Sequence, residues 1–205
     1  MSDLFESSGL ADDAPRPLAD RLRPLALDQV VGQDHLLGAE SPLGRMVARG
    51  VPHSIILWGP PGTGKTTIAR LLAGAFKLHF EQLSAVFSGV SDLKKTFEAA
   101  RERRRMGQGT LLFIDEIHRF NRSQQDSFLP VVEDGTIILV GATTENPSFE
   151  LNGALLSRAQ VLVLRRLDDA ALEALLQRAE AWYEAKLPLT ADARATLRAM
   201  ADTSR

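Results

Sequence analysis

The chain has 205 residues, and its 44% of hydrophobic residues can supply the core of one α/β domain with a small appended one. It has no cysteine, which excludes disulfides and thiolate metal sites, and its formal net charge of −2 gives no general argument for nucleic-acid binding. No apolar run approaches the ~20 residues that span a bilayer, and the acidic N-terminus lacks the basic start of a signal peptide, so we expect a cytoplasmic protein with no membrane partner.

The first fifty residues predict an arm, a connector and a helix. Residues 1–16 carry acids, serine, glycine and proline with little periodicity, which is typical of a flexible arm. The stretch 28–38 has the composition of a buried connector. Ser41 followed by Pro42 predicts the start of a short helix, and Gly50 predicts its end.

Residues 59–66 read GPPGTGKT and match every position of the phosphate-loop pattern G-x-x-x-x-G-K-[ST]. A short apolar run of strand type, residues 54–58, precedes the loop, and apolar residues at helical spacing follow it. Glycine lets the backbone approach a polyphosphate closely, so that N–H groups and a helix N-terminus point at its oxygens. The alternative is a glycine-rich turn with a solvated lysine. The residues expected to contact nucleotide here are Gly59, Pro60, Pro61, Gly62, Thr63, Gly64, Lys65, Thr66 and Thr67.

Two side chains of this loop carry the expected chemistry. Lys65 adds a positive charge near the β and γ phosphates, and the Thr66 hydroxyl can bind Mg²⁺. The pattern therefore predicts ATP and Mg²⁺ as ligands.

A second strand is expected at residues 80–85, followed by a helix over 92–106. The helix ends in a run of arginines. Cations suit a helix C-terminus, so a solvated helix end accounts for them; a patch that contacts phosphates is the alternative. The arginines are Arg101, Arg103, Arg104 and Arg105.

Residues 110–117, TLLFIDEI, form an apolar run that ends in two carboxylates. Such a run suits a parallel strand buried on both faces. If the strand continues through both acids, Asp115 and Glu116 point to opposite sides at its carboxyl end, where ligands of open α/β sheets bind. One acid can then hold Mg²⁺ while the other orients a water, although a plain polar strand end is the alternative.

The next segment predicts another helix and strand. Ser123 with Asp126 indicates a capping box, and the helix is expected to end before Gly135. A buried strand over 136–142 follows, and the polar residues after it either sense the γ-phosphate or begin a loop. These residues are Thr143, Thr144, Glu145 and Asn146.

A short helix at 152–158 and a fifth strand at 160–164 complete a regular alternation of strands and helices. This order predicts an α/β fold of the P-loop NTPase type, with a five-stranded parallel sheet flanked by helices. Two helices without a strand follow, the first capped by Asp168 or Asp169. We therefore expect an α/β nucleotide-binding domain at 17–167 and the start of a small all-α lid at 168–205.

The finer wording of several segments resembles the replication-associated recombination protein A family. Its members are AAA+ ATPases related to clamp-loader subunits and to the Werner-helicase-interacting ATPase of eukaryotes. The stretches that carry the resemblance are PLADRLRP at 17–24, VVGQDHLLG at 30–38, GPPGTGKTTIAR at 59–70, FIDEIHRFNRSQQDSFLPVVEDG at 113–135 and GATTENPSFELNGALLSR at 141–158.

This resemblance implies catalytic roles at matching positions. Glu116 would polarise the attacking water, Asp115 would support Mg²⁺, and Thr144 would be the sensor 1 residue, although Thr143 and Asn146 are neighbouring candidates. Arg158 would be the arginine finger, which in such proteins reaches the γ-phosphate of a neighbouring subunit.

Further positions follow from the same resemblance. Val31 and Gly32 would line the adenine pocket. Arg205 is the candidate for the sensor 2 arginine, although the sequence MADTSR lacks the glycine-aspartate pair that the family usually carries there. The family's C-terminal oligomerisation region has no counterpart in this chain.

The resemblance also implies the function. It is ATP hydrolysis coupled to DNA at stalled or damaged replication forks, gaps or ends, by a nucleoid-associated homo-oligomer, a tetramer or hexamer, with single-strand-binding protein as a candidate partner. The alternatives are a clamp-loader subunit or a Holliday-junction branch-migration ATPase. A further alternative is an ATP-dependent binding switch without essential hydrolysis, against which Glu116 argues, because a switch needs no water-polarising acid.

Overall fold

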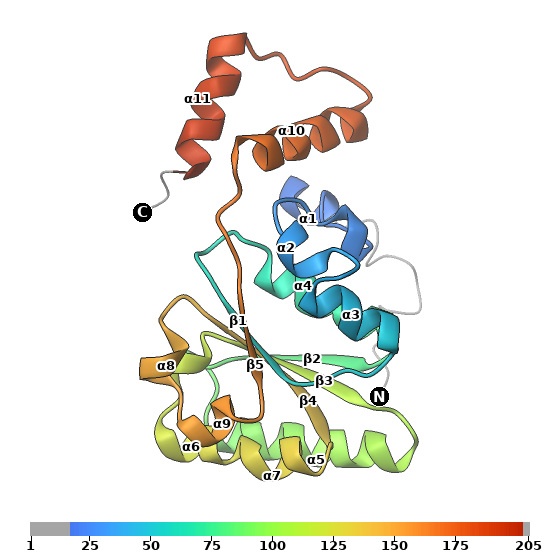
Figure 1. Cartoon of the computed structure of the whole chain (residues 1–205), viewed down its shortest axis with the longest axis vertical. Helices are drawn as coiled ribbons and strands as arrows, with labels where there is room; N and C mark the ends of the chain where they lie inside the picture. The colour runs from blue at the N-terminus through green and yellow to red at the C-terminus, as the bar shows by residue number, and fades with distance from the viewer. Residues whose placement is uncertain (1–16, 203–205) are drawn as a thin grey trace.

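The computed structural model describes residues 17–202, and within them the chain forms a five-stranded parallel sheet with helices on both faces (Figure 1). The strands are β1 Ile55–Trp58, β2 His79–Ser84, β3 Thr110–Asp115, β4 Ile137–Thr143 and β5 Gln160–Val163. Their order across the sheet is β2-β3-β4-β1-β5, and every neighbouring pair is parallel. The predicted α/β fold and its five-stranded parallel sheet are therefore confirmed.

Helices fill the connections between the strands and continue beyond the last strand. They are α1 Leu18–Arg21, η1 Leu27–Gln29, α2 Asp34–Leu37, α3 Pro42–Arg49, α4 Lys65–Ala75, α5 Val90–Arg105, η2 Ile117–Arg119, α6 Arg122–Asp126, α7 Phe128–Glu133, α8 Pro147–Glu150, α9 Gly153–Leu156, α10 Asp169–Tyr183 and α11 Ala191–Asp202. Among residues 17–202, no helix is both long and apolar enough to cross a membrane. The predicted arm at 1–16 and the candidate Arg205 lie outside the described residues.

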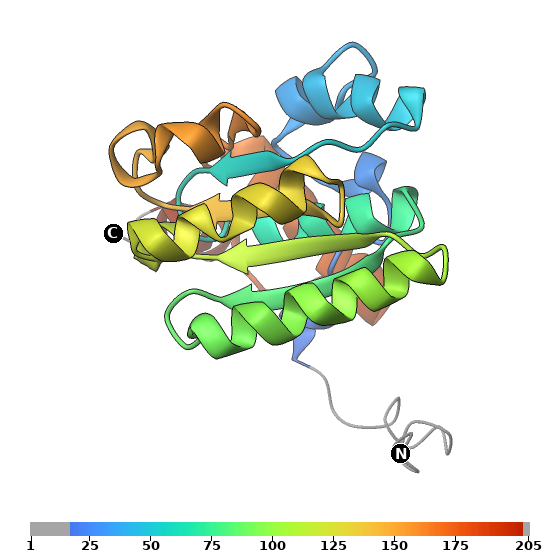
Figure 2. The same cartoon turned by 90° about the horizontal axis from the view of Figure 1, so that it is seen from below.

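Strand side chains alternate between two apolar cores, one on each face of the sheet. Leu57 and Phe113 pack with α3 and α4 on one face, whereas Ile56 and Leu112 pack with α5 and α7 on the other. Figure 2 shows the strand arrows pointing the same way, with α5 and α7 crossing the near face. Because both faces are covered, the central strands are almost continuous apolar runs, as buried parallel strands are.

The cap of the helix after β3 differs from the sequence expectation. The capping box consists of Asn121 and Gln124 rather than Ser123 and Asp126. The Asn121 side chain accepts from the Gln124 N–H at 2.9 Å, and the Gln124 side chain accepts from the Asn121 N–H at 3.0 Å. Phe120 is buried in the core directly before the cap, which fixes where the helix can begin. The single helix predicted here is also wrong, since α6 and α7 are separate helices.

Two connectors contain more helix than expected. The stretch 28–38 includes the last two residues of η1 and all of α2, and it buries Gln33 and Leu36. Asn146 does not begin a loop, because its side chain accepts from the Ser148 N–H at 3.0 Å and caps α8.

The predicted caps of α3 are confirmed. The Ser41 hydroxyl accepts from the Gly44 N–H at 3.3 Å, and Pro42 occupies the first helical position. Gly50 ends the helix with a φ of 66°, in the left-handed region that glycine adopts without strain.

Helix α10 lies beside the N-terminal segment, residues 17–38 with α1 and α2, rather than on the sheet (Figure 1). The Asp168 side chain caps the helix by accepting from the Ala171 N–H at 2.8 Å. Arg178 then donates to the carbonyls of Leu22 at 3.3 Å and Gln29 at 2.5 Å. These bonds tie α10 to the chain just before the sheet.

Ion pairs hold α11 against α10. Arg194 contacts Glu173 at 2.7 Å and Glu180 at 2.6 Å, and Arg198 contacts Glu173 at 2.8 Å. Hydrogen bonds from Arg194 lower the pKa of Glu173 to about 2. The charges that join these two helices are therefore mutually paired.

The arginine run at the end of α5 is engaged within the domain. Arg103 pairs with Glu81 at 2.7 Å, and Arg104 lies 3.5 Å from Asp134. This pairing favours a helix end with compensated charge over a patch that contacts phosphates.

We expect Phe128→Ala to lower the free energy of unfolding by about 3–5 kcal/mol, the usual cost of deleting a buried aromatic ring. Phe128 is fully buried, with its ring centroid 5.5 Å from that of Phe97 and 5.8 Å from that of Phe120. Chemical denaturation measures the loss. The matched control is Phe149→Ala, because Phe149 is 85% exposed and its loss should change the value by less than about 0.5 kcal/mol. Equal effects of the two variants would contradict this account of the core.

Candidate functional site

The loop after β1 starts between the ends of β4 and β5, the strands on either side of β1. The Gly59 N–H donates to the Thr143 carbonyl of β4 at 3.1 Å. A Cβ on Gly59 would lie 2.6 Å from the Leu164 carbonyl oxygen, just beyond β5. Only glycine fits at this position, because the backbone itself contacts both neighbours.

The loop then turns into α4 through left-handed backbone. Gly62 has a φ of 77° and Gly64 a φ of 91°, and open space lies where their side chains would be. The Thr63 hydroxyl donates to the Pro60 carbonyl at 2.9 Å and closes the loop. The result is an open cradle of backbone N–H groups at the N-terminus of α4, which is suited to an anion.

Lys65 is held inside this cradle. Its ammonium donates to the carbonyls of Gly59 at 2.7 Å and Pro60 at 2.8 Å. Burial lowers the pKa of Lys65, while the nearby carboxylates of Glu116 and Asp115 act in the opposite direction. The charge of this buried ammonium is only partly compensated by the two acids, so a polyanion that binds beside it stabilises it further.

The two acids do not alternate along a strand as expected, because β3 ends at Asp115. Glu116 has a φ of 54°, in the left-handed region. This conformation costs a non-glycine residue about 1–2 kcal/mol, and such strain often occurs at functional sites. The Arg119 N–H donates to the Glu116 carbonyl at 2.8 Å and stabilises the turn. The turn, rather than strand alternation, decides where the Glu116 side chain points.

A cavity of about 490 Å³ brings the predicted catalytic groups together. They come from the loop with α4, from the end of β3 and from the end of β4. Both acids line the cavity despite the turn. Its walls are Ala19, Arg23, Pro61, Gly62, Thr63, Gly64, Lys65, Thr66, Thr67, Asp115, Glu116 and Thr144.

The structure distinguishes between the threonines at the end of β4. Thr144 lines the cavity. Thr143 is fully buried, and its hydroxyl contacts the His118 ring at 2.9 Å and the Glu145 N–H at 3.0 Å. Thr144 is therefore the threonine placed to contact a ligand.

An apolar cavity of about 390 Å³ adjoins the first one. Val31 lines this cavity, as expected for an adenine pocket, together with Leu22, Leu167 and Leu175. Gly32 lies behind the wall, because a Cβ on it would be 2.8 Å from Leu167. A side chain at Gly32 would therefore collide with Leu167, and the φ of 73° at this position also favours glycine.

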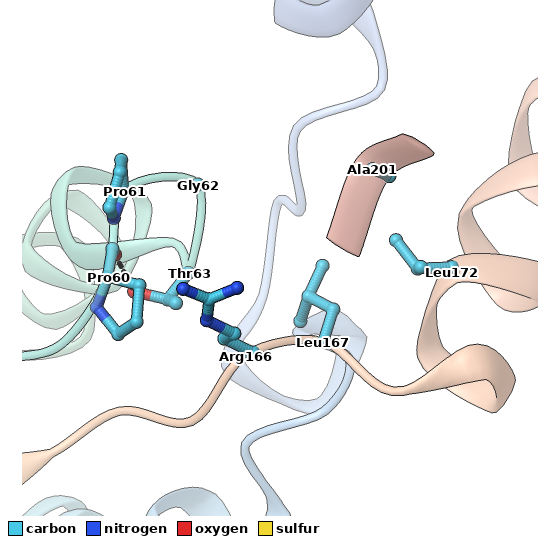
Figure 3. Close-up of a pocket in the computed structure, with 8 residues that line it drawn as sticks. All are labelled: Pro60, Pro61, Gly62, Thr63, Arg166, Leu167, Leu172 and Ala201. Atoms are coloured by element: carbon cyan, nitrogen blue, oxygen red, sulfur yellow. Dashed lines mark hydrogen bonds between the residues drawn. The ribbon is translucent and has the colours of Figure 1, made fainter. Parts of the chain in front are cut away.

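A smaller cavity of about 210 Å³ separates the loop from α10 and α11. Figure 3 shows the Arg166 guanidinium directed toward Pro60 and Thr63, with Leu172 and Ala201 on the opposite side. The loop is thus flanked by the N-terminal segment and by both C-terminal helices.

Arg158 lies away from these three cavities. Its guanidinium donates to Glu133 at 2.6 Å and to the Ala154 carbonyl at 2.8 Å. Within one chain, Arg158 therefore does not join the other predicted catalytic residues.

Two polar residues in or beside the site, Arg23 and His118, are among those that were not identified from the sequence. Arg23 lines both the polar and the apolar cavity and pairs with Asp20 at 2.8 Å. His118 lies beside Glu116, with 3.4 Å between a ring nitrogen and the carboxylate. The available signals were that Arg23 belongs to the stretch PLADRLRP and that His118 closely follows the acid pair. Neither an arginine nor a histidine is specific enough on its own to identify a site residue.

The donor set fits Mg²⁺. The Thr66 hydroxyl and the Asp115 carboxylate belong to the same cavity, and both are oxygen ligands of the kind that Mg²⁺ prefers. Among the described residues there is no cluster of three or more His, Asp or Glu side chains that could hold a metal alone. Mg²⁺ typically binds through one or two protein ligands together with substrate phosphates.

Comparisons with known proteins identify relatives of this chain. The model of the AAA family, ATPases associated with various cellular activities, matches residues 55–167. Replication-associated recombination protein A of Escherichia coli K12 is 54% identical over 179 residues, which cover 87% of this chain and 40% of that protein. The ATPase WRNIP1 of Dictyostelium discoideum is 48% identical over 162 residues, which cover 79% of this chain and 18% of that protein.

Solved structures give the same fold. The RuvB Holliday junction branch migration motor of Thermotoga maritima matches with a TM-score of 0.66 and 31% identity, covering 80% of this chain and 55% of that one.

The chain spans about 40% of the length of the Escherichia coli relative. The chain belongs to the AAA family of ATPases and, within it, to the replication-associated recombination protein A family.

Proposed function

We propose that this chain is the nucleotide-binding part of an ATPase that acts on DNA during replication-associated recombination. The observation that carries the proposal is the single cavity lined by Lys65, Thr66, Asp115, Glu116 and Thr144. These residues come from three separate segments, and each has the chemistry that one part of ATP hydrolysis needs. The DNA process is taken from the name of the Escherichia coli relative.

In this proposal the triphosphate lies along the loop and the base lies in the apolar cavity. Backbone N–H groups from Gly62 to Thr66 hold the phosphate oxygens, and Lys65 turns from the loop carbonyls to the β and γ phosphates. Val31 and Leu167 enclose the base. Arg23, which lines both cavities, is close enough to the triphosphate to add a further positive charge.

The chemical step uses the residues at the strand ends. Thr66 and Asp115 hold Mg²⁺, which neutralises charge on the phosphates when it is bound. Glu116 orients the attacking water and accepts its proton. The Thr144 hydroxyl donates a hydrogen bond to the γ-phosphate. Each group thus acts at an atom whose charge changes during the reaction.

Arg158 completes the site of a neighbouring subunit. This assignment is supported by its absence from the lining of the three cavities in its own chain and by its position beside Glu133, a partner that it can exchange for a phosphate. Residues 168–205 form the beginning of a lid over the nucleotide, and Arg205 is its candidate phosphate ligand. The full-length assembly is a homo-tetramer or homo-hexamer.

The DNA substrate is proposed to be a fork, gap or end, with single-strand-binding protein as a candidate partner. A second candidate function is branch migration of a four-way junction. The likeness to the RuvB motor, at a TM-score of 0.66, favours it. Turnover stimulated by four-way junctions but not by forks or gaps would select this second function.

Lys65→Ala should weaken ATP binding about 10- to 100-fold, because charge-assisted hydrogen bonds contribute about 1.5–3 kcal/mol each. Titration with a fluorescent ATP analogue measures the affinity. Lys95→Ala removes an exposed lysine on α5 and should bind like wild type. Undiminished ATP affinity in the folded Lys65→Ala protein would show that the nucleotide binds elsewhere.

Glu116→Gln should lower ATP turnover by about 10²-fold or more, the usual contribution of a general base, and abolish its stimulation by DNA. Affinity for ATP should change little, since the group acts after binding. Phosphate release with and without forked DNA measures both effects. Glu98→Gln, an exposed acid on α5, is the matched control. Turnover that survives Glu116→Gln would refute the assignment of the base.

Arg158→Ala should lower turnover by about 10³-fold or more while sparing ATP affinity, as loss of an arginine finger does. Mixing it with Lys65→Ala should restore part of the activity. In mixed assemblies the intact loop of one subunit meets the intact Arg158 of the other. Arg49→Ala, an exposed arginine on α3, should give no comparable loss. If Arg158→Ala loses ATP affinity as much as turnover, Arg158 is not a finger.

A further inference from the structure

His118 lies between the proposed base and the sensor end of β4. It belongs to η2, which begins directly after Glu116, and its side chain is only 6% exposed. One ring nitrogen, Nε2, lies 3.4 Å from the Glu116 carboxylate, and the other, Nδ1, lies 2.9 Å from the Thr143 hydroxyl. A buried imidazole therefore contacts both groups.

The Thr143 end of this contact is held by burial and by hydrogen bonds. The residue is fully buried, and its hydroxyl also accepts from the Glu145 N–H at 3.0 Å. Its carbonyl accepts from the Gly59 N–H of the phosphate loop at 3.1 Å. The next residue, Thr144, lines the cavity. His118 is thus anchored where the loop and β4 meet.

One assignment of donors and acceptors suits the contacts that link Glu116, His118, Thr143 and the Glu145 N–H. A carboxylate only accepts, so we assign the ring proton to Nε2, the nitrogen that faces Glu116 at 3.4 Å. Nδ1 then accepts from the Thr143 hydroxyl, whose lone pairs accept from the Glu145 N–H. The Glu145 N–H and the Thr143 hydroxyl then each have an acceptor, and the Nε2–H faces the Glu116 carboxylate. The hydroxyl has a competing acceptor in the Glu145 carbonyl, but at a longer distance of 3.3 Å.

The contact with Glu116 is longer than an ordinary hydrogen bond of about 2.7–3.2 Å. The ring thus orients the carboxylate without locking it, and the carboxylate can turn toward a water. Glu116 needs such guidance because its left-handed backbone separates it from the strand that fixes Asp115.

We propose that His118 is a positioning residue that sets the orientation of Glu116 and couples it to the end of β4. A change at Thr144 on arrival of the γ-phosphate reaches Glu116 through Thr143 and His118. The inference rests on the proposed ATPase function, and it assigns His118 no contact with nucleotide. A histidine that only fills space in the core would leave turnover unchanged once the protein is folded.

The experiment compares steady-state ATP turnover of wild type with His118→Ala, His118→Gln and His118→Asn, after thermal melts have shown each protein to be folded. We expect His118→Ala to lower kcat about 10-fold or more, which is part of the ~10²–10⁴-fold that general acid–base catalysis contributes, with KM for ATP little changed. Glutamine can place its amide nitrogen near the Nε2 position, whereas asparagine reaches only the Nδ1 position. His118→Gln should therefore retain more activity than His118→Asn.

Two further measurements separate positioning from a structural effect. His118→Ala should cause no additional loss in a Glu116→Gln background, because it acts through that carboxylate. Thr143→Val should lower kcat, whereas Thr110→Val should not. Thr110 is an equally buried threonine at the start of β3, away from Asp115, and among residues 17–202 its hydroxyl has no hydrogen-bond partner.

Distinct outcomes overturn the inference and the proposed function. Wild-type kcat in His118→Ala, a loss that lies only in KM, or a multiplied loss in the Glu116→Gln background would each overturn the role of His118 alone. Absence of Glu116-dependent ATP turnover in the wild-type protein would overturn the proposed function, and the role of His118 with it.

Discussion

The close approach of backbones at Gly59 is the constraint on which the rest of the site depends. Its N–H is bonded to the Thr143 carbonyl, and its missing side chain leaves room for the Leu164 carbonyl. This packing fixes the start of the loop between the ends of β4 and β5. The N-terminus of α4 and Lys65 are then directed to the edge of the sheet where the parallel strands end.

The strand order determines which side chains meet the loop. Because β4 lies between β1 and β3, residues at the ends of β3 and β4 stand beside the loop that follows β1. The two apolar cores hold this order by covering both faces of the sheet. Hydrophobic burial thus supplies the rigidity, and the polar groups are concentrated where the strands emerge from it. Asp115 and Thr144 owe their places to this arrangement.

Much of the architecture could be predicted because its signals are local. Buried strands are short apolar runs, and the loop has a fixed glycine pattern. The predictions were wrong at positions whose conformation depends on packing against neighbouring elements. The helix cap after β3 is Asn121 rather than Ser123, because the residue before it, Phe120, is held in the core. Glu116 left the strand pattern because the chain turns there through left-handed backbone. The contact of His118 with Thr143 joins two segments that no sequence spacing relates.

The phosphate loop, the acid pair, the alternation of strands and helices, and the family resemblance can all be recognised in the linear sequence. These follow from residue types at fixed local spacings. In contrast, the folded chain was needed to show that Thr144 rather than Thr143 faces the cavity, and that Arg158 pairs with Glu133 away from it. Such facts depend on the rotation of strand ends and on contacts between distant segments. Side-chain direction is fixed by packing, and a linear pattern does not encode the packing partner.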